Sequence, residues 1–310
     1  MINTYIISGF LGAGKTTFIS HLLKMNLGKV MLLENEFGEV GVDASFFDKS
    51  LAIKEVNNGC ICCSLQGDFK EALKEIEDYD INTLIIEPSG VGKLSDVMST
   101  LFDNDNYRLL AHVCIVNVDT CKKYHLNYKE FFDDQVIASN AIILSHLDVA
   151  SHEKYAEALE ILHQLNDEAV ISDRPIEEYT NEELLDLIVK NVCTCPECVE
   201  HHDEHCCCHE HGHEHHHHHH HHHHDGDEVF DSFAFTSEHL YTKEELEEVF
   251  KDLDESILRI KGYVKGVNTT WYFNYILNEY HIFEGEHQDE ALIVVIGTKL
   301  DEEKIKELFK

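Results

Sequence analysis

The sequence predicts an α/β protein: a parallel sheet with helices on both faces, followed by a small α+β domain. Three observations lead to this prediction. A glycine-rich motif at residues 9–16 lies between an apolar run and an amphipathic helical pattern. Strand-like and helical segments then alternate up to about residue 192. Finally, a cysteine- and histidine-rich segment at 193–227 separates this region from grouped strands at 228–310.

The motif at residues 9–16 matches the phosphate-loop pattern G-x-x-x-x-G-K-[ST] at every fixed position. In such a loop, backbone N–H groups and a helix N-terminus surround anionic phosphates. We expect Lys15 to reach the outer phosphates and the Thr16 hydroxyl to ligate Mg²⁺. The alternative, an ordinary glycine-containing turn, is disfavoured because pattern and context agree. The expected nucleotide contacts are Gly9, Gly12, Ala13, Gly14, Lys15, Thr16 and Thr17.

Further apolar runs predict the remaining strands of this P-loop domain, residues 1–192. They lie at 29–34, 82–90, 109–119, 141–145 and 169–172. Helical spacing is clearest at 69–78, 154–165 and 181–192. The polar segment 35–43, which contains two glycines, lies where a nucleotide-hydrolysing domain would have a switch loop.

Residues 228–310 carry a second set of patterns. Strands are predicted at 229–235, 257–265, 269–275, 279–283 and 292–297, and helices at 242–253 and from about 301. Thr242 and Glu245 form a candidate capping box for the first of these helices. Strands grouped between two helices indicate an α+β domain with a mainly antiparallel sheet.

Composition restricts the function classes. The chain of 310 residues has 59 acidic and 24 basic residues and a net charge of −35, which argues against a nucleic-acid partner. No apolar stretch approaches the roughly 20 residues that span a bilayer, so no membrane association is expected. Eleven cysteines, mostly clustered, in a chain without a signal peptide indicate metal ligands in a reducing, cytoplasmic setting.

Two segments compete for recognition of the base. Guanine-specific enzymes of this architecture use an Asp in a short [NST]-K-x-D segment. Ser145-His146-Leu147-Asp148 follows a predicted strand at the right place but has His where Lys is expected. Thr298-Lys299-Leu300-Asp301 matches the letters better, yet it lies beyond the histidine tract, where Asp301 is expected to cap the last helix. We therefore assign base recognition to Asp148.

Acidic residues near the predicted strand ends are candidate metal and phosphate contacts. Glu87 ends a strand three residues before Gly90, so it is placed to bind Mg²⁺ through water, or to sense the terminal phosphate through the Gly90 N–H. A solvated acid at a strand end is the plainer alternative. Glu34, Glu36 and Glu39 have the same alternative as ordinary loop acids.

The segment Cys60-Ile61-Cys62-Cys63 is the second informative motif. Thiolates two and three positions apart can converge on one ion, with carboxylates or a histidine completing a tetrahedral site for zinc or a similar ion. The alternative, cysteines packed as small apolar residues, is disfavoured by three cysteines in four positions beside Asn-Gly.

The segment 193–227 is a linker rich in metal-binding side chains. It contains sixteen of the 25 histidines and too few apolar residues to fold alone, so we expect it to be disordered without metal. Imidazole and thiolate suit zinc, nickel, copper and cobalt. A passive acidic spacer and a purification tag are the alternatives. The ligands we expect first are Cys193, Cys195, Cys198, His201 and His205.

Taken together and in this order, the segments 9–17, 34–39, 59–63 and 87–90 resemble the CobW-type GTPases. That family is related to the nickel-inserting GTPases of hydrogenase and urease maturation, HypB and UreG. Residues 258–262 and 293–297 look like the family's C-terminal domain, so the resemblance covers nearly the whole chain.

The resemblance implies a magnesium-dependent GTPase that carries a transition metal to a client metalloprotein. The mixed Cys/His chemistry, and a histidine tract that suits storage, make zinc the first candidate, followed by nickel and cobalt. A homodimer is one candidate assembly. His146 departs from the family's usual lysine, and a histidine ring can stack on the purine instead. The implied site residues are Lys15, Thr16 and Glu87 for phosphate and Mg²⁺, and Cys60, Cys62, Cys63, Glu34 and Glu39 for the metal.

Two other functions stay open from the sequence. One is a metal buffer in which the histidine tract is the main functional part. The other is a regulatory nucleotide hydrolase indifferent to metal.

Overall fold

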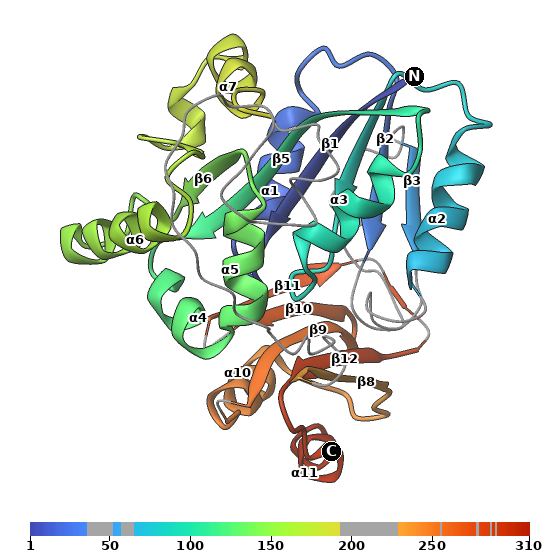
Figure 1. Ribbon diagram of the computed structural model, residues 1–310. Helices are drawn as coiled ribbons and strands as arrows, with labels where there is room; N and C mark the ends of the chain where they lie inside the picture. The colour runs from blue at the N-terminus through green and yellow to red at the C-terminus, as the bar shows by residue number, and fades with distance from the viewer. Residues whose placement is uncertain are drawn as a thin grey trace. The chain divides into compact units, whose positions relative to one another are not determined.

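The computed structural model describes residues 1–35, 52–56, 65–192, 229–254, 256–276, 279–285, 287–288 and 290–310 (Figure 1). The chain forms two compact units. The first is built on strands β1 to β7 and the second on strands β8 to β12.

The first unit is a seven-stranded sheet in the order β3-β2-β4-β1-β5-β6-β7, and every pairing in it is parallel. This confirms the predicted fold class. The strands are β1 Ile2–Gly9, β2 Val30–Asn35, β3 Ala52–Val56, β4 Thr83–Glu87, β5 Tyr107–Asn117, β6 Ala141–Ser145 and β7 Val170–Ile171.

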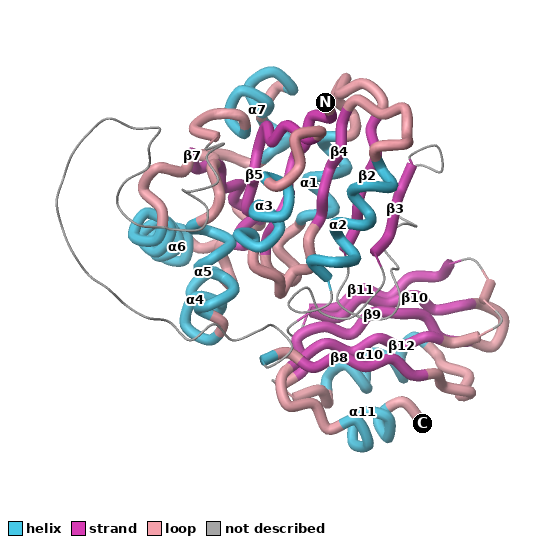
Figure 2. The backbone as a smooth tube through the Cα atoms, turned by 45° about the vertical axis from the view of Figure 1, so that its right-hand side comes forward, coloured by secondary structure: helices cyan, strands magenta, loops and turns pink. Residues whose placement is uncertain are grey.

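Helices cover both faces of this sheet. One face packs against α1 and α7 in a single apolar core that includes Tyr5, Ile7 and Leu184. Helices α2, α3 and α5 lie over the opposite face (Figures 1 and 2). The helices are α1 Lys15–Leu22, α2 Leu65–Ile76, α3 Leu94–Phe102, α4 Cys121–Asn127, α5 Lys129–Ile137, α6 His152–Leu165 and α7 Asn181–Ile188, with a 3₁₀ turn at Ile176–Glu178.

The apolar runs predicted as strands are strands, because a parallel sheet covered on both faces buries both sides of its strands. All five residues of β4 are buried, for example. Strand β3 was not predicted from the sequence. Among the described strands it pairs with β2 alone, at the edge of the sheet, and its sequence contains Lys54 and Glu55, charges that are common on edge strands and that mask an apolar pattern.

The second unit is a five-stranded antiparallel sheet in the order β11-β10-β9-β12-β8. Its strands are β8 Asp231–Phe235, β9 Ile257–Lys265, β10 Thr270–Ile276, β11 Glu279–Gly285 and β12 Leu292–Gly297. Helices α10 (Lys243–Lys251) and α11 (Glu302–Leu308) contribute Phe250 and Ile305 to its core. The capping box of Thr242 and Glu245 at the start of α10 is present as predicted.

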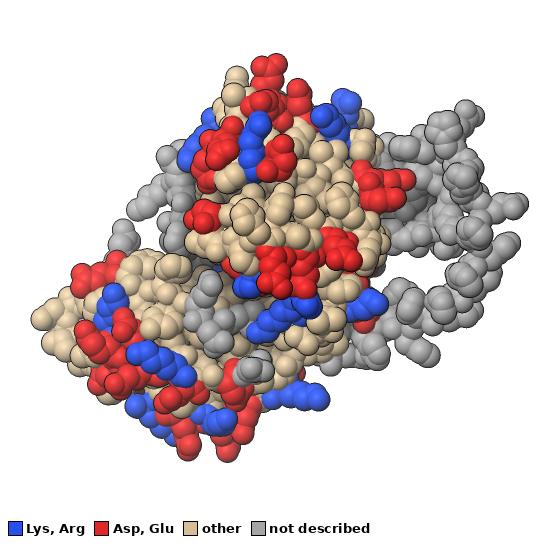
Figure 3. Space-filling view, turned by 90° about the vertical axis from the view of Figure 1, so that its left-hand side faces the viewer, with Lys and Arg blue, Asp and Glu red and all other residues tan. Residues whose placement is uncertain are grey.

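The described surface agrees with the charge of the chain. On the face shown in Figure 3, Lys and Arg side chains are scattered among Asp and Glu and form no continuous basic patch among the described residues. Within the same residues, no helix combines the length and the apolarity that a bilayer crossing requires.

One buried histidine makes stability depend on pH. His112 in β5 is 4% exposed, its Nδ1 donates to the Ala138 carbonyl, and burial lowers its pKa from 6.5 to about 4. Between these values the unfolded chain binds a proton that the folded chain excludes. The stabilisation is therefore complete above the unfolded pKa and is lost on acidification. The free energy of unfolding should fall by roughly 3 kcal/mol as the pH drops to about 4.

Replacing His112 with glutamine should remove this dependence, measured by urea unfolding over the same pH range. The exposed His163 on α6 gives a matched substitution, His163→Gln, with which the loss of the buried imidazole is compared. Equal slopes for wild type and His112→Gln would contradict the assignment.

Candidate functional site

Three glycines shape the loop between β1 and α1. The φ angles of Gly9, Gly12 and Gly14 are 146°, 72° and 98°, backbone values that residues other than glycine rarely adopt. At Gly9 a Cβ atom would also lie 2.6 Å from the carbonyl oxygen of Ile115. The loop therefore needs glycine for its backbone course and for its close contact with β5.

The loop places a buried cation at the start of a helix. Gly14 is the N-cap of α1 and supplies no side-chain cap, so the N–H groups of the first turn are available to an anion. The next residue, Lys15, is 8% exposed, and its Nζ donates to the Gly9 carbonyl at 3.0 Å. Thr16 is half-buried and Thr17 exposed. The structure thus gathers the predicted phosphate contacts in one place.

Glu87 and Gly90 lie against this loop. Glu87 is the last residue of β4, is 7% exposed, and has its Oε1 atom 4.0 Å from Lys15 Nζ. A turn follows, in which the Gly92 N–H donates to the Ser89 carbonyl at 3.1 Å. A Cβ at Gly90 would lie 3.1 Å from the Leu11 nitrogen and 3.2 Å from Lys15 Nζ. Any larger residue at this position would require Leu11 or Lys15 to shift, so glycine suits the close approach of this turn to the phosphate loop.

Glu34 is the second buried carboxylate at this edge of the sheet. It is 3% exposed and is the direct register partner of Glu87 in the parallel pair of β2 and β4. Register partners in a parallel pair point to the same face of the sheet. Buried carboxylates are retained where cations balance them. Two buried carboxylates and the Lys15 ammonium therefore lie together, and the excess of negative charge favours the binding of a further cation.

Several predicted site segments lie outside the described residues. Among the residues described, no group of three or more His, Cys, Asp and Glu side chains is placed to hold a metal ion. Outside the described residues lie the predicted switch segment from residue 36 to 43, with Glu36 and Glu39, the thiols Cys60, Cys62 and Cys63, and the linker ligands Cys193, Cys195, Cys198, His201 and His205.

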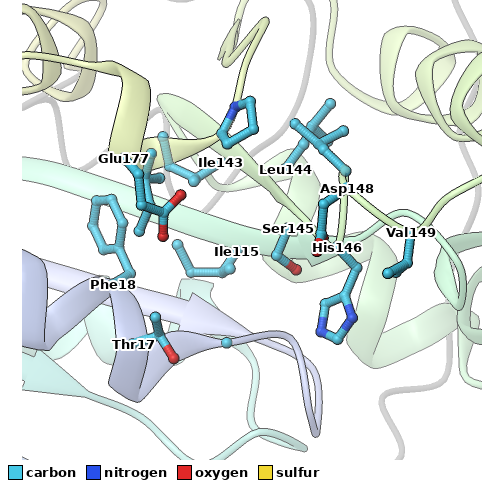
Figure 4. Close-up of a pocket in the computed structure, with 14 residues that line it drawn as sticks. Thr17, Phe18, Ile115, Ile143, Leu144, Ser145, His146, Asp148, Val149 and Glu177 are labelled. Carbon is cyan, nitrogen blue, oxygen red and sulfur yellow. The ribbon is translucent and has the colours of Figure 1, made fainter.

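A pocket of about 480 Å³ opens beside the phosphate loop (Figure 4). Gly14 and Thr17 form one side, and the segment after β6, with His146 and Asp148, forms another. The Ser145 hydroxyl donates to the Ala13 carbonyl at 2.7 Å and so ties the two sides together. A pocket of this size at the carboxyl ends of parallel strands suits a purine ring.

The pocket separates the two candidate base-reading residues. Asp148 lines it, whereas Asp301 is the N-cap of α11 and accepts a hydrogen bond from the Lys304 N–H at 3.1 Å. Asp301 therefore caps the last helix, as expected. His146, at the position where lysine was expected, adopts a φ of 60° and also lines the pocket.

Sequence reasoning missed other parts of the site. Pro175, Ile176 and Glu177 line the pocket from the segment after β7. A usable signal existed, because the carboxyl ends of all parallel strands meet at one edge, and residues after β7 had to lie there. Tyr124 on α4, whose hydroxyl donates to the Leu11 carbonyl at 3.0 Å, carried no such signal.

Comparison with known protein families agrees with this geometry. The model of the CobW/HypB/UreG nucleotide-binding domain matches residues 3–173, which include the phosphate loop, Glu87 and Asp148. The chain belongs to the CobW/HypB/UreG family. A second model, the C-terminal domain of the cobalamin synthesis protein cobW, matches residues 230–310. The resemblance predicted from the sequence is confirmed over both units of the CobW-type chain.

Several relatives within the family are similar in sequence. Zinc chaperone YjiA of Escherichia coli (strain K12) is 34% identical over 167 residues, which cover 50% of this chain and 52% of YjiA. Zinc chaperone YeiR of the same organism is 31% identical over 217 residues, covering 66% and 64%. Zinc-regulated GTPase metalloprotein activator 1 of Dictyostelium discoideum is 27% identical over 229 residues, covering 58% and 48%. The chain thus spans between about half and two thirds of these curated relatives' lengths.

Among solved structures, Zn(II)-bound YjiA GTPase from E. coli aligns with 99% of this chain and 98% of its own. The TM-score is 0.45 and the sequence identity is 20%.

Proposed function

We propose that this chain is a GTP-hydrolysing metallochaperone that binds a transition metal, zinc first and then nickel or cobalt, and transfers it to a client metalloprotein. The observation that carries the proposal is the arrangement of Lys15, Glu87 and Glu34: Glu87 lies 4.0 Å from the Lys15 ammonium and is the register partner of Glu34. These residues lead from the phosphate loop to the carboxyl ends of the strands where the metal ligands are expected. The names of YjiA and YeiR as zinc chaperones support the choice of zinc.

Guanine nucleotide binding is supported by the loop and the pocket together. The phosphates are suited by the glycines of the loop, by the N-terminus of α1, which has no side-chain cap, and by Lys15. The adjoining pocket is lined by Asp148, whose carboxylate can accept hydrogen bonds from the guanine N1–H and 2-amino groups. His146 offers a flat ring in place of the aliphatic stem of lysine.

The residues present also fit Mg²⁺. The Thr16 hydroxyl, in the first turn of α1, and the buried Glu87 carboxylate are oxygen donors of the kind that Mg²⁺ prefers, and they would hold it directly or through water. When bound, Mg²⁺ would neutralise charge on the outer phosphates.

The proposed cargo site combines Glu34 and Glu39 with the thiolates of Cys60, Cys62 and Cys63. Chain connectivity supports this set. Val56 ends β3 and pairs with Asn35, the neighbour of Glu34. Cys60 follows Val56 by only four residues, so the thiol motif is close in sequence to the end of β3. Thiolate and carboxylate donors together suit zinc.

Nucleotide and cargo are coupled through charge in this proposal. A triphosphate attracts the Lys15 ammonium and weakens its interaction with Glu87 Oε1, now 4.0 Å away. The electrostatic interaction between Glu87 and its register partner Glu34 then changes, and with it the attraction of Glu34 for a metal ion. By linkage, a nucleotide that alters metal affinity must have its own affinity altered by the same factor.

We expect the affinity for Zn²⁺ to differ by about 10- to 100-fold between protein loaded with magnesium and a non-hydrolysable GTP analogue and protein loaded with GDP. Calorimetric titration of each form measures this ratio, and Co²⁺ and Ni²⁺ are compared in the same way. Cys62→Ala should abolish the tight site in both forms. Cys121→Ala, a buried thiol at the start of α4, is the control that should leave the ratio intact.

The sixteen histidines of the linker favour a second candidate function, a metal buffer. Deleting residues 193–226 separates the two. If the deletion removes all tight zinc binding and Cys62→Ala changes nothing, the buffer function is correct. If the deletion lowers only the number of weakly bound ions, including those on Cys193, Cys195, Cys198, His201 and His205, the chaperone function stands.

A further inference from the structure

The turn that carries Gly90 is held from outside by helix α5. Gln135 on this helix is 1% exposed, and its Nε2 donates to the Gly92 carbonyl at 2.6 Å. Gly92 is also the last residue of the turn closed onto Ser89. Gly92 lies two residues after Gly90 in the same turn, so its position sets that of Gly90, where an added Cβ would lie 3.1 Å from the Leu11 nitrogen and 3.2 Å from Lys15 Nζ.

Two further side chains of α5 hold the residues that follow the turn. The Lys93 ammonium pairs with Glu130 at 2.6 Å. Asp134 accepts a hydrogen bond from the Ser95 N–H at 3.2 Å and another from the Ser95 hydroxyl. Together with Gln135, these contacts fix the segment 92–95 along one side of the helix.

The same helical hairpin holds the phosphate loop. On α4, the Tyr124 hydroxyl donates to the Leu11 carbonyl at 3.0 Å, and its ring lies 4.3 Å from that of Phe10. Tyr128, between α4 and α5, stacks on Phe10 with ring centroids 5.3 Å apart. Hairpin α4–α5 is therefore a common support for the phosphate loop and for the Gly90 turn.

We propose that Gln135 is a positioning residue that sets the distance between Gly90 and the phosphate loop, and that it thereby makes the protein distinguish a nucleoside triphosphate from a diphosphate. The inference rests on the proposed nucleotide function. In nucleotide switches only the γ-phosphate meets the turn after the acidic strand end. A displaced Gly90 N–H therefore weakens triphosphate binding and leaves diphosphate binding unchanged.

A second feature of Gln135 supports a role beyond packing. Its Oε1 atom is buried and accepts no hydrogen bond from the residues that the structure describes. An apolar side chain of similar size would avoid that desolvation cost, so the amide is retained for what its donor does. The donor serves the Gly92 carbonyl alone among its described contacts.

The test compares Gln135→Leu with Asn140→Leu. Leucine keeps the approximate volume of each buried side chain and removes its donor. Asn140, 3% exposed, is a buried amide away from the turn: it donates to the Ile188 carbonyl at 2.7 Å and to the Lys190 carbonyl, and accepts from the His112 N–H at 2.7 Å, so it is the control for loss of a buried amide. Affinities for GDP and for a non-hydrolysable GTP analogue are measured for each variant, with GTP turnover. Glu130→Gln, at a partly exposed position, is a milder second variant.

For Gln135→Leu we expect GDP affinity within about twofold of wild type and analogue affinity and kcat lowered about tenfold, the effect of one buried hydrogen bond. Glu130→Gln should shift the ratio about threefold in the same direction. Asn140→Leu should lower the melting temperature without changing the ratio. An unchanged ratio in both α5 variants overturns the inference. A wild-type protein that does not distinguish the two nucleotides overturns the proposed function itself.

Discussion

Replacing Lys15 with alanine is expected to lower the rate of GTP hydrolysis by about 10²- to 10³-fold, the effect of removing one charged donor to a developing anion. Lys15 is the buried cation of the phosphate loop, and its Nζ lies 3.0 Å from the Gly9 carbonyl and 4.0 Å from Glu87. Steady-state phosphate release measures the effect. Lys24→Ala, an exposed lysine just beyond α1, is the control with wild-type turnover.

Arginine should not restore the activity. Lys15 is 8% exposed and its Nζ donates to the Gly9 carbonyl at 3.0 Å, and a planar guanidinium, which is larger than an ammonium and has a different donor geometry, does not reproduce that contact at a buried position. Turnover in Lys15→Ala equal to that of wild type would show that hydrolysis takes place elsewhere in the chain.

The second large effect is expected at Asp148. Asp148→Asn should lower GDP affinity by about 100-fold if the proposed base recognition holds, because a carboxylate can accept from both guanine donors whereas the amide that replaces it can accept from only one. The same change should raise the affinity for xanthosine diphosphate, whose 2-carbonyl accepts from the new amide N–H. Competition against a fluorescent GDP analogue measures both affinities.

Two other carboxylates make the test specific. Glu177 lines the same pocket, so Glu177→Gln tests whether loss of any carboxylate from the pocket changes base preference. Asp301→Asn should affect only stability, because Asp301 caps α11. A change from guanine to xanthine preference in either of these variants, and not in Asp148→Asn, would move base recognition away from Asp148.

Much of the fold followed from local pattern. The strand ends at Glu87 and Ser145 and the helix at 154–165 were readable because buried parallel strands are continuously apolar and exposed helices repeat every 3.6 residues. Strand β3 could not be predicted from the sequence. It lies at the edge of the sheet, where charged side chains are tolerated, and Lys54 and Glu55 interrupt its apolar pattern.

The candidate site also has residues whose place could be predicted from the sequence and residues whose place could not. That Lys15 and Thr16 lie on a glycine-rich loop could be predicted because the phosphate-loop pattern fixes the spacing of glycine, lysine and hydroxyl, and that Glu87 lies beside them could be predicted from its place at a strand end. Gln135 and Tyr124 were not, since a lone amide or phenol on a helix has no spacing that distinguishes it from an ordinary side chain. Their roles appear only when Gly92 and Leu11 lie beside them.

The sequence by itself determined the phosphate loop, the two-part architecture and the acidic strand ends, because each depends on residues close together in the chain. The tertiary structure decided which residues after β7 join Asp148 in the pocket, the register that sets Glu34 beside Glu87, and the support that α5 gives to the Gly90 turn. These depend on strand order and helix packing, which bring together residues separated by tens of positions, and no local pattern encodes such distances.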